Sequence, residues 1–252
     1  MTKPSGGGKE FEIVREFEVG SPPREVWDAF TTGTGGWLWP MEYEPREGGA
    51  GPFGGVVTVW DPPRRLTVRS ADPDALPPGQ SLNQLEHEIE PRDGGRRSWV
   101  RYAHSGIFTG NAEDPENLYD AAARHLDFHL HTLRQYLTYF AGRPVAFLAL
   151  DAPASSVRPD AFAKLARELG LPTDASEGAR VRLGAAGTEL DALVDFRTPY
   201  FIGLRTDDAL YRLFGRNHFG APVGVSIHDF APHADAKGTE FAWRDWLTRL
   251  YG

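Results

Sequence analysis

Cysteine is absent from the 252-residue chain. Without it the protein has no disulfide bonds, thiolate zinc sites, iron–sulfur clusters or cysteine nucleophiles. A metal site would have to use histidine and carboxylate ligands, and the pair His125 and His129 has a chelating spacing but no Glu directly after its first member. We therefore expect no metal and no other cofactor.

The chain also lacks a long apolar segment. No stretch approaches the roughly 18 apolar residues that a membrane-spanning helix needs. The first ten residues, MTKPSGGGKE, are polar and rich in glycine, with no apolar run behind the lysine, so they do not have the pattern of a signal peptide. These patterns predict a flexible tail over residues 1–9, no membrane span and a cytoplasmic location.

Positive charge is scarce. Lysine and arginine number 27 against 35 aspartate and glutamate, a formal net charge of −8, and the basic residues cluster no further than adjacent pairs. A nucleic-acid backbone requires grouped Lys and Arg, so we expect no DNA or RNA partner. With 40% hydrophobic and 12% aromatic residues the chain is a folded one. Its length predicts two units of roughly 100–140 residues each.

The hydrophobic periodicity predicts one order of elements in the first half. Residues 11–19 alternate as a strand, Pro23 then opens a short helix, and a long helix runs from 114 to near 142. Between the two helices a series of antiparallel strands is predicted at 41–46, 55–60, 65–70, 81–90 and 97–108.

The second half repeats this order in shorter form. Strands are predicted at 145–150, 179–184, 189–197, 199–205 and 223–230, and helices at 159–169, 207–214 and 239–250. The long helix stops at Gly142-Arg143-Pro144 and a new strand follows almost at once. The predicted fold class is α+β, with a first domain over residues 10–142 and a second, shortened α+β domain over 143–252.

A group of motifs in the first half resembles a known superfamily. They are the strand at 11–19, the helix Ser21-Pro22-Pro23-Arg24-Glu25-Val26-Trp27-Asp28-Ala29-Phe30, the turn Trp37-Leu38-Trp39-Pro40, and Gly-Gly-Val-Val at 54–57. Together they resemble the START-like (SRPBCC, Bet v 1-like) superfamily, in its activator of heat-shock-90 ATPase homology branch, over about residues 10–142. The resemblance implies a helix-grip fold, in which a curved antiparallel sheet surrounds a long C-terminal helix. Relatives hold lipids, sterols, polyketides or hormones in an internal cavity between the two, and residues 143–252 are interpreted as a degenerate second copy.

Histidines and aromatic residues supply the candidate site. Alternation along strands 81–90 and 97–108 puts His87, Tyr102 and His104 on the apolar, inward face, and His129 lies at the edge of the inward stripe of the long helix. Trp37 and Trp39 either form the cavity rim or close the core. The candidate ligand-binding residues are His87, Tyr102, His104, His129, Trp37 and Trp39. A histidine beside apolar residues on a strand is more often a half-buried side chain bonded to a carbonyl or a water, and this remains the alternative for His87 and His104.

Three functions remain open, and no catalytic residue is singled out. The chain can be a carrier or sensor of a small hydrophobic ligand, since it has aromatic residues for a cavity and no catalytic motif. It can be a cofactor-independent cyclase, dehydratase or hydrolase, with His87 or His104 and Tyr102 moving protons. It can regulate a chaperone ATPase or bind another protein partner, including a second copy of itself. The first of these is the principal prediction.

Overall fold

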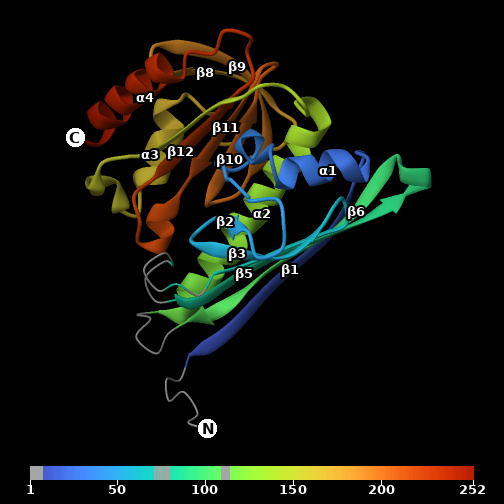
Figure 1. The fold of residues 1–252 in the computed structure, drawn as a ribbon. Coiled ribbons are helices and arrows are strands. Elements are labelled where there is room, and N and C mark those ends of the chain that lie inside the picture. The colour runs from blue at the N-terminus through green and yellow to red at the C-terminus, as the bar shows by residue number, and fades with distance from the viewer. Residues whose placement is uncertain (1–7, 71, 73–75, 77–79, 109–113) are drawn as a thin grey trace. The chain divides into compact units, whose positions relative to one another are not determined.

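The computed structural model describes residues 8–70, 72, 76, 80–108 and 114–252. Residues 1–7 of the predicted tail lie outside this part of the chain. The protein has two compact units, each with its own sheet (Figure 1). The first unit contains residues up to 34, 40–127 and 133–141; the second contains 35–39, 128–132 and 142–252.

The first unit is built on a six-stranded antiparallel sheet with the strand order β1-β6-β5-β4-β3-β2. Its strands are β1 (Lys9–Val19), β2 (Ala50–Gly51), β3 (Gly55–Asp61), β4 (Arg65–Ser70), β5 (Gln80–Arg92) and β6 (Arg97–Phe108). Its helices are α1 (Pro23–Phe30) and α2 (Pro115–Tyr139), the latter shared with the second unit through residues 128–132.

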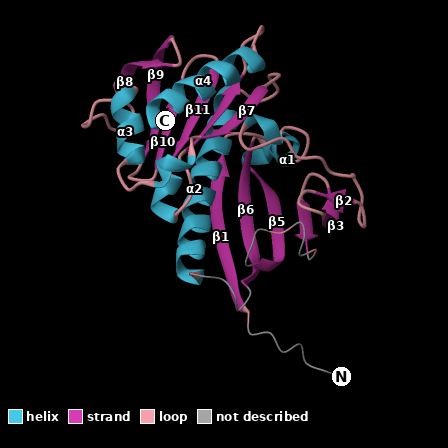
Figure 2. Ribbon diagram, turned by 90° about the vertical axis from the view of Figure 1, so that its left-hand side faces the viewer, coloured by secondary structure: helices cyan, strands magenta, loops and turns pink. Residues whose placement is uncertain are grey.

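Helix α2 runs alongside β1, as Figure 2 shows. The Asp114 side chain accepts a hydrogen bond from the Asn117 backbone N–H and so caps the helix start. Further along, Nε of Arg15 on β1 donates to Oδ1 of Asp127 at 2.5 Å. The guanidinium of Arg134 lies 4.3 Å from the centre of the Phe17 ring. These contacts hold the helix against the same face of the sheet that the sequence predicts to be inward.

The second unit has another six-stranded antiparallel sheet, with the order β7-β12-β11-β10-β9-β8. Its strands are β7 (Ala146–Asp151), β8 (Arg180–Ala185), β9 (Thr188–Arg197), β10 (Phe201–Arg205), β11 (Ala209–Phe214) and β12 (Gly224–Asp229). Helices α3 (Ala161–Glu168) and α4 (Ala236–Tyr251) bury Leu165, Trp243 and Leu247 in one core with Val194 and Ile227 of the sheet.

Two predicted elements are wrong. Residues 41–46 form no strand: the chain there is irregular, held by the Thr34 hydroxyl, which accepts from the Met41 N–H, and by the Glu44 N–H, which donates to the Ala50 carbonyl. Residues 207–214 form no helix but the strand β11, which pairs with β10 and β12. Both faces of β11 are buried, so its apolar residues show no alternation and mimic a helical spacing.

The predicted fold class is confirmed. Each unit follows the order strand, short helix, antiparallel strands and closing helix, and the described residues form two six-stranded antiparallel sheets with four α-helices. None of these helices combines the length and the apolar character needed to cross a membrane.

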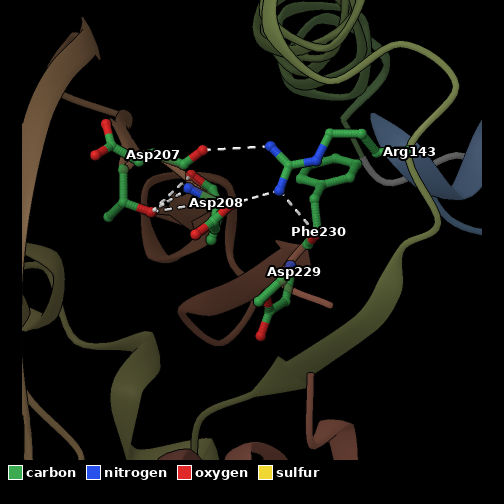
Figure 3. Close-up of polar contacts among 8 residues, drawn as sticks. Arg143, Asp207, Asp208, Asp229 and Phe230 are labelled. Atoms are coloured by element: carbon green, nitrogen blue, oxygen red, sulfur yellow. Dashed lines mark hydrogen bonds and ion pairs between the residues drawn. The ribbon is translucent and has the colours of Figure 1, made fainter. Parts of the chain in front are cut away.

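An arginine anchors the start of the second unit (Figure 3). Nη2 of Arg143 donates to the Asp208 carboxylate and, at 2.9 Å, to the carbonyl oxygen of Phe230. Its Nη1 lies 3.4 Å from the carbonyl oxygen of Asp207, and the guanidinium sits 5.9 Å from the Phe230 ring centre. One side chain therefore joins the segment before β7 to the β10–β11 turn and to the end of β12.

Candidate functional site

The inner face of the first sheet, defined by His87, Tyr102 and His104, has one tightly packed end. His87 on β5 and Tyr102 on β6 are directly paired in the register, and their rings meet edge to face at 4.7 Å. Phe30 of α1 covers His87 at 4.3 Å between ring centres. All three side chains are buried. We call this the closed end, because side chains fill the space there.

Burial keeps the polar groups of the closed end uncharged. It lowers the pKa of His87 to about 4, against a weaker opposing effect of the Leu66 backbone. Burial also raises the pKa of Tyr102 above its ordinary value. At neutral pH this end of the inner face therefore presents a neutral imidazole and a neutral phenol.

The other end of the inner face is loosely packed. Nε2 of His104 donates to Oδ1 of Asn83 at 2.7 Å, and the Phe11 ring meets the imidazole edge to face at 5.3 Å. Burial lowers the pKa of His104 to about 4. His104 and Asn83 both retain partial exposure, as does Leu85, which pairs with His104 in the register. We call this the open end.

A pocket of about 350 Å³ adjoins the open end. Phe11 stacks on Phe108 at 4.5 Å, and both rings line the pocket together with Tyr119 from the first turns of α2. Tyr119 is 42% exposed, although the helical stripe predicts it to be inward. The rest of the lining is charged: Lys9, Glu10, Glu12 and Glu116. His104 thus sits directly behind the aromatic wall of a pocket that opens to solvent on one side.

The remaining candidates belong to the second unit. His129 packs edge to face on Trp39 at 5.7 Å and lies 5.7 Å from the Phe214 ring. Trp37 is buried, whereas Trp39 is 39% exposed. The structure therefore groups His87, Tyr102 and His104 in the first unit and the other three in the second.

Sequence reasoning missed Asn83, because amides on a half-polar strand are common and carry no pattern. The signal that was available is its position two residues before Leu85, which puts it on the inner face by the same alternation that places His87.

A buried ion pair in the second unit was also missed. The guanidinium of Arg212 on β11 donates to both carboxylate oxygens of Asp195 on β9, at 2.7 and 2.9 Å. Both side chains are almost fully buried. Nε2 of His131 lies 3.5 Å from Oδ1 of the same carboxylate. Burial alone would raise the pKa of Asp195, but the charge of Arg212 and the contact with His131 outweigh it and hold that pKa below its ordinary value.

A glycine makes room for this pair. A Cβ at Gly203 on β10 would lie 2.2 Å from Oδ1 of Asp195 and 2.5 Å from Nη1 of Arg212. The Phe128 ring covers the pair, 5.7 Å from the guanidinium carbon. Since both charges already have a partner, we interpret the pair as structural and not as a site for a ligand.

No family model and no curated protein matches the sequence, but several solved structures are similar to this chain. Solved structures that are similar include CalU16 from Micromonospora echinospora, with 19% identity over 55% of this chain and 82% of that one, at a TM-score of 0.40. The Aha1 dimer from Colwellia psychrerythraea shows 17% identity over 50% of this chain and 96% of that one, at 0.39.

A third similar structure extends over both units. DynU16, described as a putative protein in the dynemicin biosynthetic locus, shows 12% identity over 95% of each chain at a TM-score of 0.39. At these scores the likenesses carry no argument about the site, which rests on the contacts described above.

Proposed function

We propose that the first unit binds a small, mostly apolar and uncharged molecule at the open end of its inner face, and acts as a carrier or sensor. The observation that carries the proposal is the change in packing along one face: the closed end is filled with buried aromatic rings, while the open end leaves His104 and Asn83 partly exposed beside a pocket. Ligand sites in proteins combine apolar walls with a few placed polar groups in this way.

The chemistry of the open end favours a neutral ligand. His104 has a depressed pKa and is uncharged at neutral pH. Its Nε2 hydrogen is used by Asn83, so its Nδ1 is left as an acceptor, while the Asn83 amide group retains its donors. Neither side chain lines the pocket itself. His104 packs against Phe11, which does, so the layer beneath the apolar wall is uncharged.

The same histidine supports the enzyme as a second candidate. An imidazole oriented by an amide is a recurring arrangement for a general base. However, a base with a pKa of about 4 has little affinity for a proton at pH 7, so the carrier is the better match to this environment.

Fluorescence of N-phenyl-1-naphthylamine, a neutral apolar probe, tests the proposal on the full chain. We expect saturable enhancement, and roughly two- to tenfold weaker binding in His104→Ala, the range that loss of one aromatic contact behind the Phe11 wall gives. Tyr119→Ala should also weaken binding. Tyr139→Ala is the matched control, because this tyrosine lies on the same helix with similar exposure, 49%, and does not line the pocket.

Two results would overturn the proposal. One is the absence of saturable binding. The other is a His104→Ala variant that loses several kcal/mol of stability and binds the probe unchanged, which would make His104 a core residue. Native mass spectrometry of the purified protein then separates the two candidates: a carrier retains a molecule unaltered, and an enzyme converts it.

A further inference from the structure

We propose that the second unit has a ligand site of its own, a cleft beside α3 that binds a small apolar carboxylate. This α3 cleft has a volume of about 510 Å³ and is lined by Pro159, Phe162, Ala163, Ala166, Ile202 and Pro199, together with three polar residues discussed below. The volume is in the range of pockets that hold drug-sized molecules, about 300–1,000 Å³.

The apolar wall of the cleft is built from α3 and the sheet. Phe162 and Ile202 are buried and form its base, whereas Ala163 is exposed and Ala166 is partly exposed along its side. The Phe162 ring lies against Gly215, where a Cβ would come within 2.8 Å of it. The base of the cleft is therefore an aromatic ring packed directly on the backbone at Gly215.

The ionisable groups in the lining are Arg197 and His218, and no carboxylate lines the cleft. This contrasts with the chain as a whole, whose net charge is −8. Within the described residues, the Arg197 guanidinium forms no ion pair; it donates to the carbonyl oxygens of Pro172 at 2.9 Å and Ala175 at 2.7 Å. Carbonyls orient a guanidinium without neutralising its charge. The Glu177 carboxylate accepts from the Arg197 backbone N–H and not from the guanidinium, so the side chain can still attract an anion.

The polar side of the cleft is held in place without a ligand. Asn217 donates from Nδ2 to the carbonyl oxygens of Arg158 and Pro159, which fixes the segment leading into α3. His218 rests edge to face on Tyr200 at 5.2 Å. The Thr198 hydroxyl accepts from two backbone N–H groups, and its own proton remains to be donated. A site fixed in advance binds with a smaller loss of conformational entropy.

A carboxylate on an apolar body fits this arrangement better than a phosphate. The walls are mostly carbon, and the single guanidinium of Arg197 offers charge for one negative group. A sugar phosphate would leave its hydroxyls without partners against Phe162, Ala166 and Ile202. The class of ligand we infer is therefore an aromatic or aliphatic monocarboxylate.

Fluorine NMR with 4′-fluorobiphenyl-4-carboxylate, added to the full chain, tests the inference. The matched probe is the corresponding carboxamide, which has the same body and no charge. We expect the carboxylate to bind about fivefold more tightly, the upper range for an ion pair exposed to water. This preference should disappear on addition of salt, because screening acts on the charge and not on the apolar contact.

A blocking variant locates the binding. Ala163→Trp places a ring in the cleft from an exposed helix position and should abolish carboxylate binding. Arg167→Trp, at another exposed position of the same helix outside the lining, should leave it unchanged. Equal affinity for the two probes, or carboxylate binding that survives Ala163→Trp, would overturn the inference. Neither result bears on the open end of the first unit, which Tyr119→Ala probes separately.

Discussion

The two units differ in whether they bury a charge. On the inner face of the first sheet the buried side chains of His87 and Tyr102 are neutral, as is the partly exposed His104–Asn83 pair. The second unit buries a full ion pair, Arg212 with Asp195, in addition to a neutral histidine, His228. A neutral polar face can exchange an internal partner for a ligand at little cost, whereas a buried charge that loses its partner is strongly destabilised. The comparison favours the first interior over the second for the proposed ligand, because the second core contains a buried charge pair.

The largest expected effect on stability comes from removing one charge of the Arg212–Asp195 pair. Arg212→Leu leaves the Asp195 carboxylate buried without a counter-ion, and we expect the free energy of unfolding to fall by about 3–5 kcal/mol. Urea denaturation measures the change. The double variant Arg212→Leu with Asp195→Leu should recover most of the loss, since hydrophobic replacement of a whole buried pair is often neutral.

The control is a surface pair of the same kind. Arg182 and Asp191 join neighbouring strands β8 and β9, with Nε to Oδ1 at 2.9 Å, but both side chains are exposed to solvent. Arg182→Leu should leave the urea midpoint unchanged. If Arg212→Leu behaves like Arg182→Leu, the second interior is not fixed by its ion pair.

Acid should weaken both interiors through their buried histidines, since burial also lowers the pKa of His228 in the second unit to about 3. The pKa of His87 is about 4 in the folded protein, compared with 6.5 for an ordinary histidine. Between these values the unfolded chain binds more protons, so the free energy of unfolding decreases as the pH falls from 6.5 to 4, by about 3 kcal/mol for this group. Urea midpoints across this range should be flatter in His87→Leu than in the wild type. The exposed-site variant His233→Gln is the control, and an identical slope in all three proteins would contradict the expected burial of His87.

The smallest expected effect on stability comes from adding one methyl group beside the Arg212–Asp195 pair. Gly203→Ala adds a methyl group where Asp195 and Arg212 already meet, and overpacking of this kind costs about 1–3 kcal/mol. Gly184→Ala on β8 is the matched control, because a Cβ there meets nothing within 4 Å. Thermal or urea unfolding should separate the two variants, and equal stability would show that the ion pair can shift to accommodate the methyl group.

Much of the first sheet could be predicted from the sequence. Period-two alternation is unambiguous in β5 and β6, where one face is apolar and the other carries Glu and Arg, and it put His87, Tyr102 and His104 on a common face. In β11 the same approach failed, since that strand is buried on both sides and its pattern has no period of two.

The rest of the candidate site depends on tertiary packing that local pattern does not encode. Asp195 and Arg212 lie on strands separated by β10, so nothing local indicates that they form a pair. Gly203 between them was an available signal, because a glycine inside a strand often marks a close approach. Likewise, periodicity along α2 gives a face for His129 but not the unit in which it packs.

The position of Phe128 in the chain matters for folding during synthesis. It is fully buried against Phe201 and Phe214, which lie more than seventy residues later in the chain. Since synthesis proceeds from the N-terminus, this ring and neighbouring His129 emerge from the ribosome well before the strands that bury them. Until β11 is complete the nascent polypeptide displays an uncovered aromatic side chain. A ribosome stalled before Phe201 would therefore hold a chain prone to capture by holdase chaperones, and release of the remaining residues would end that exposure.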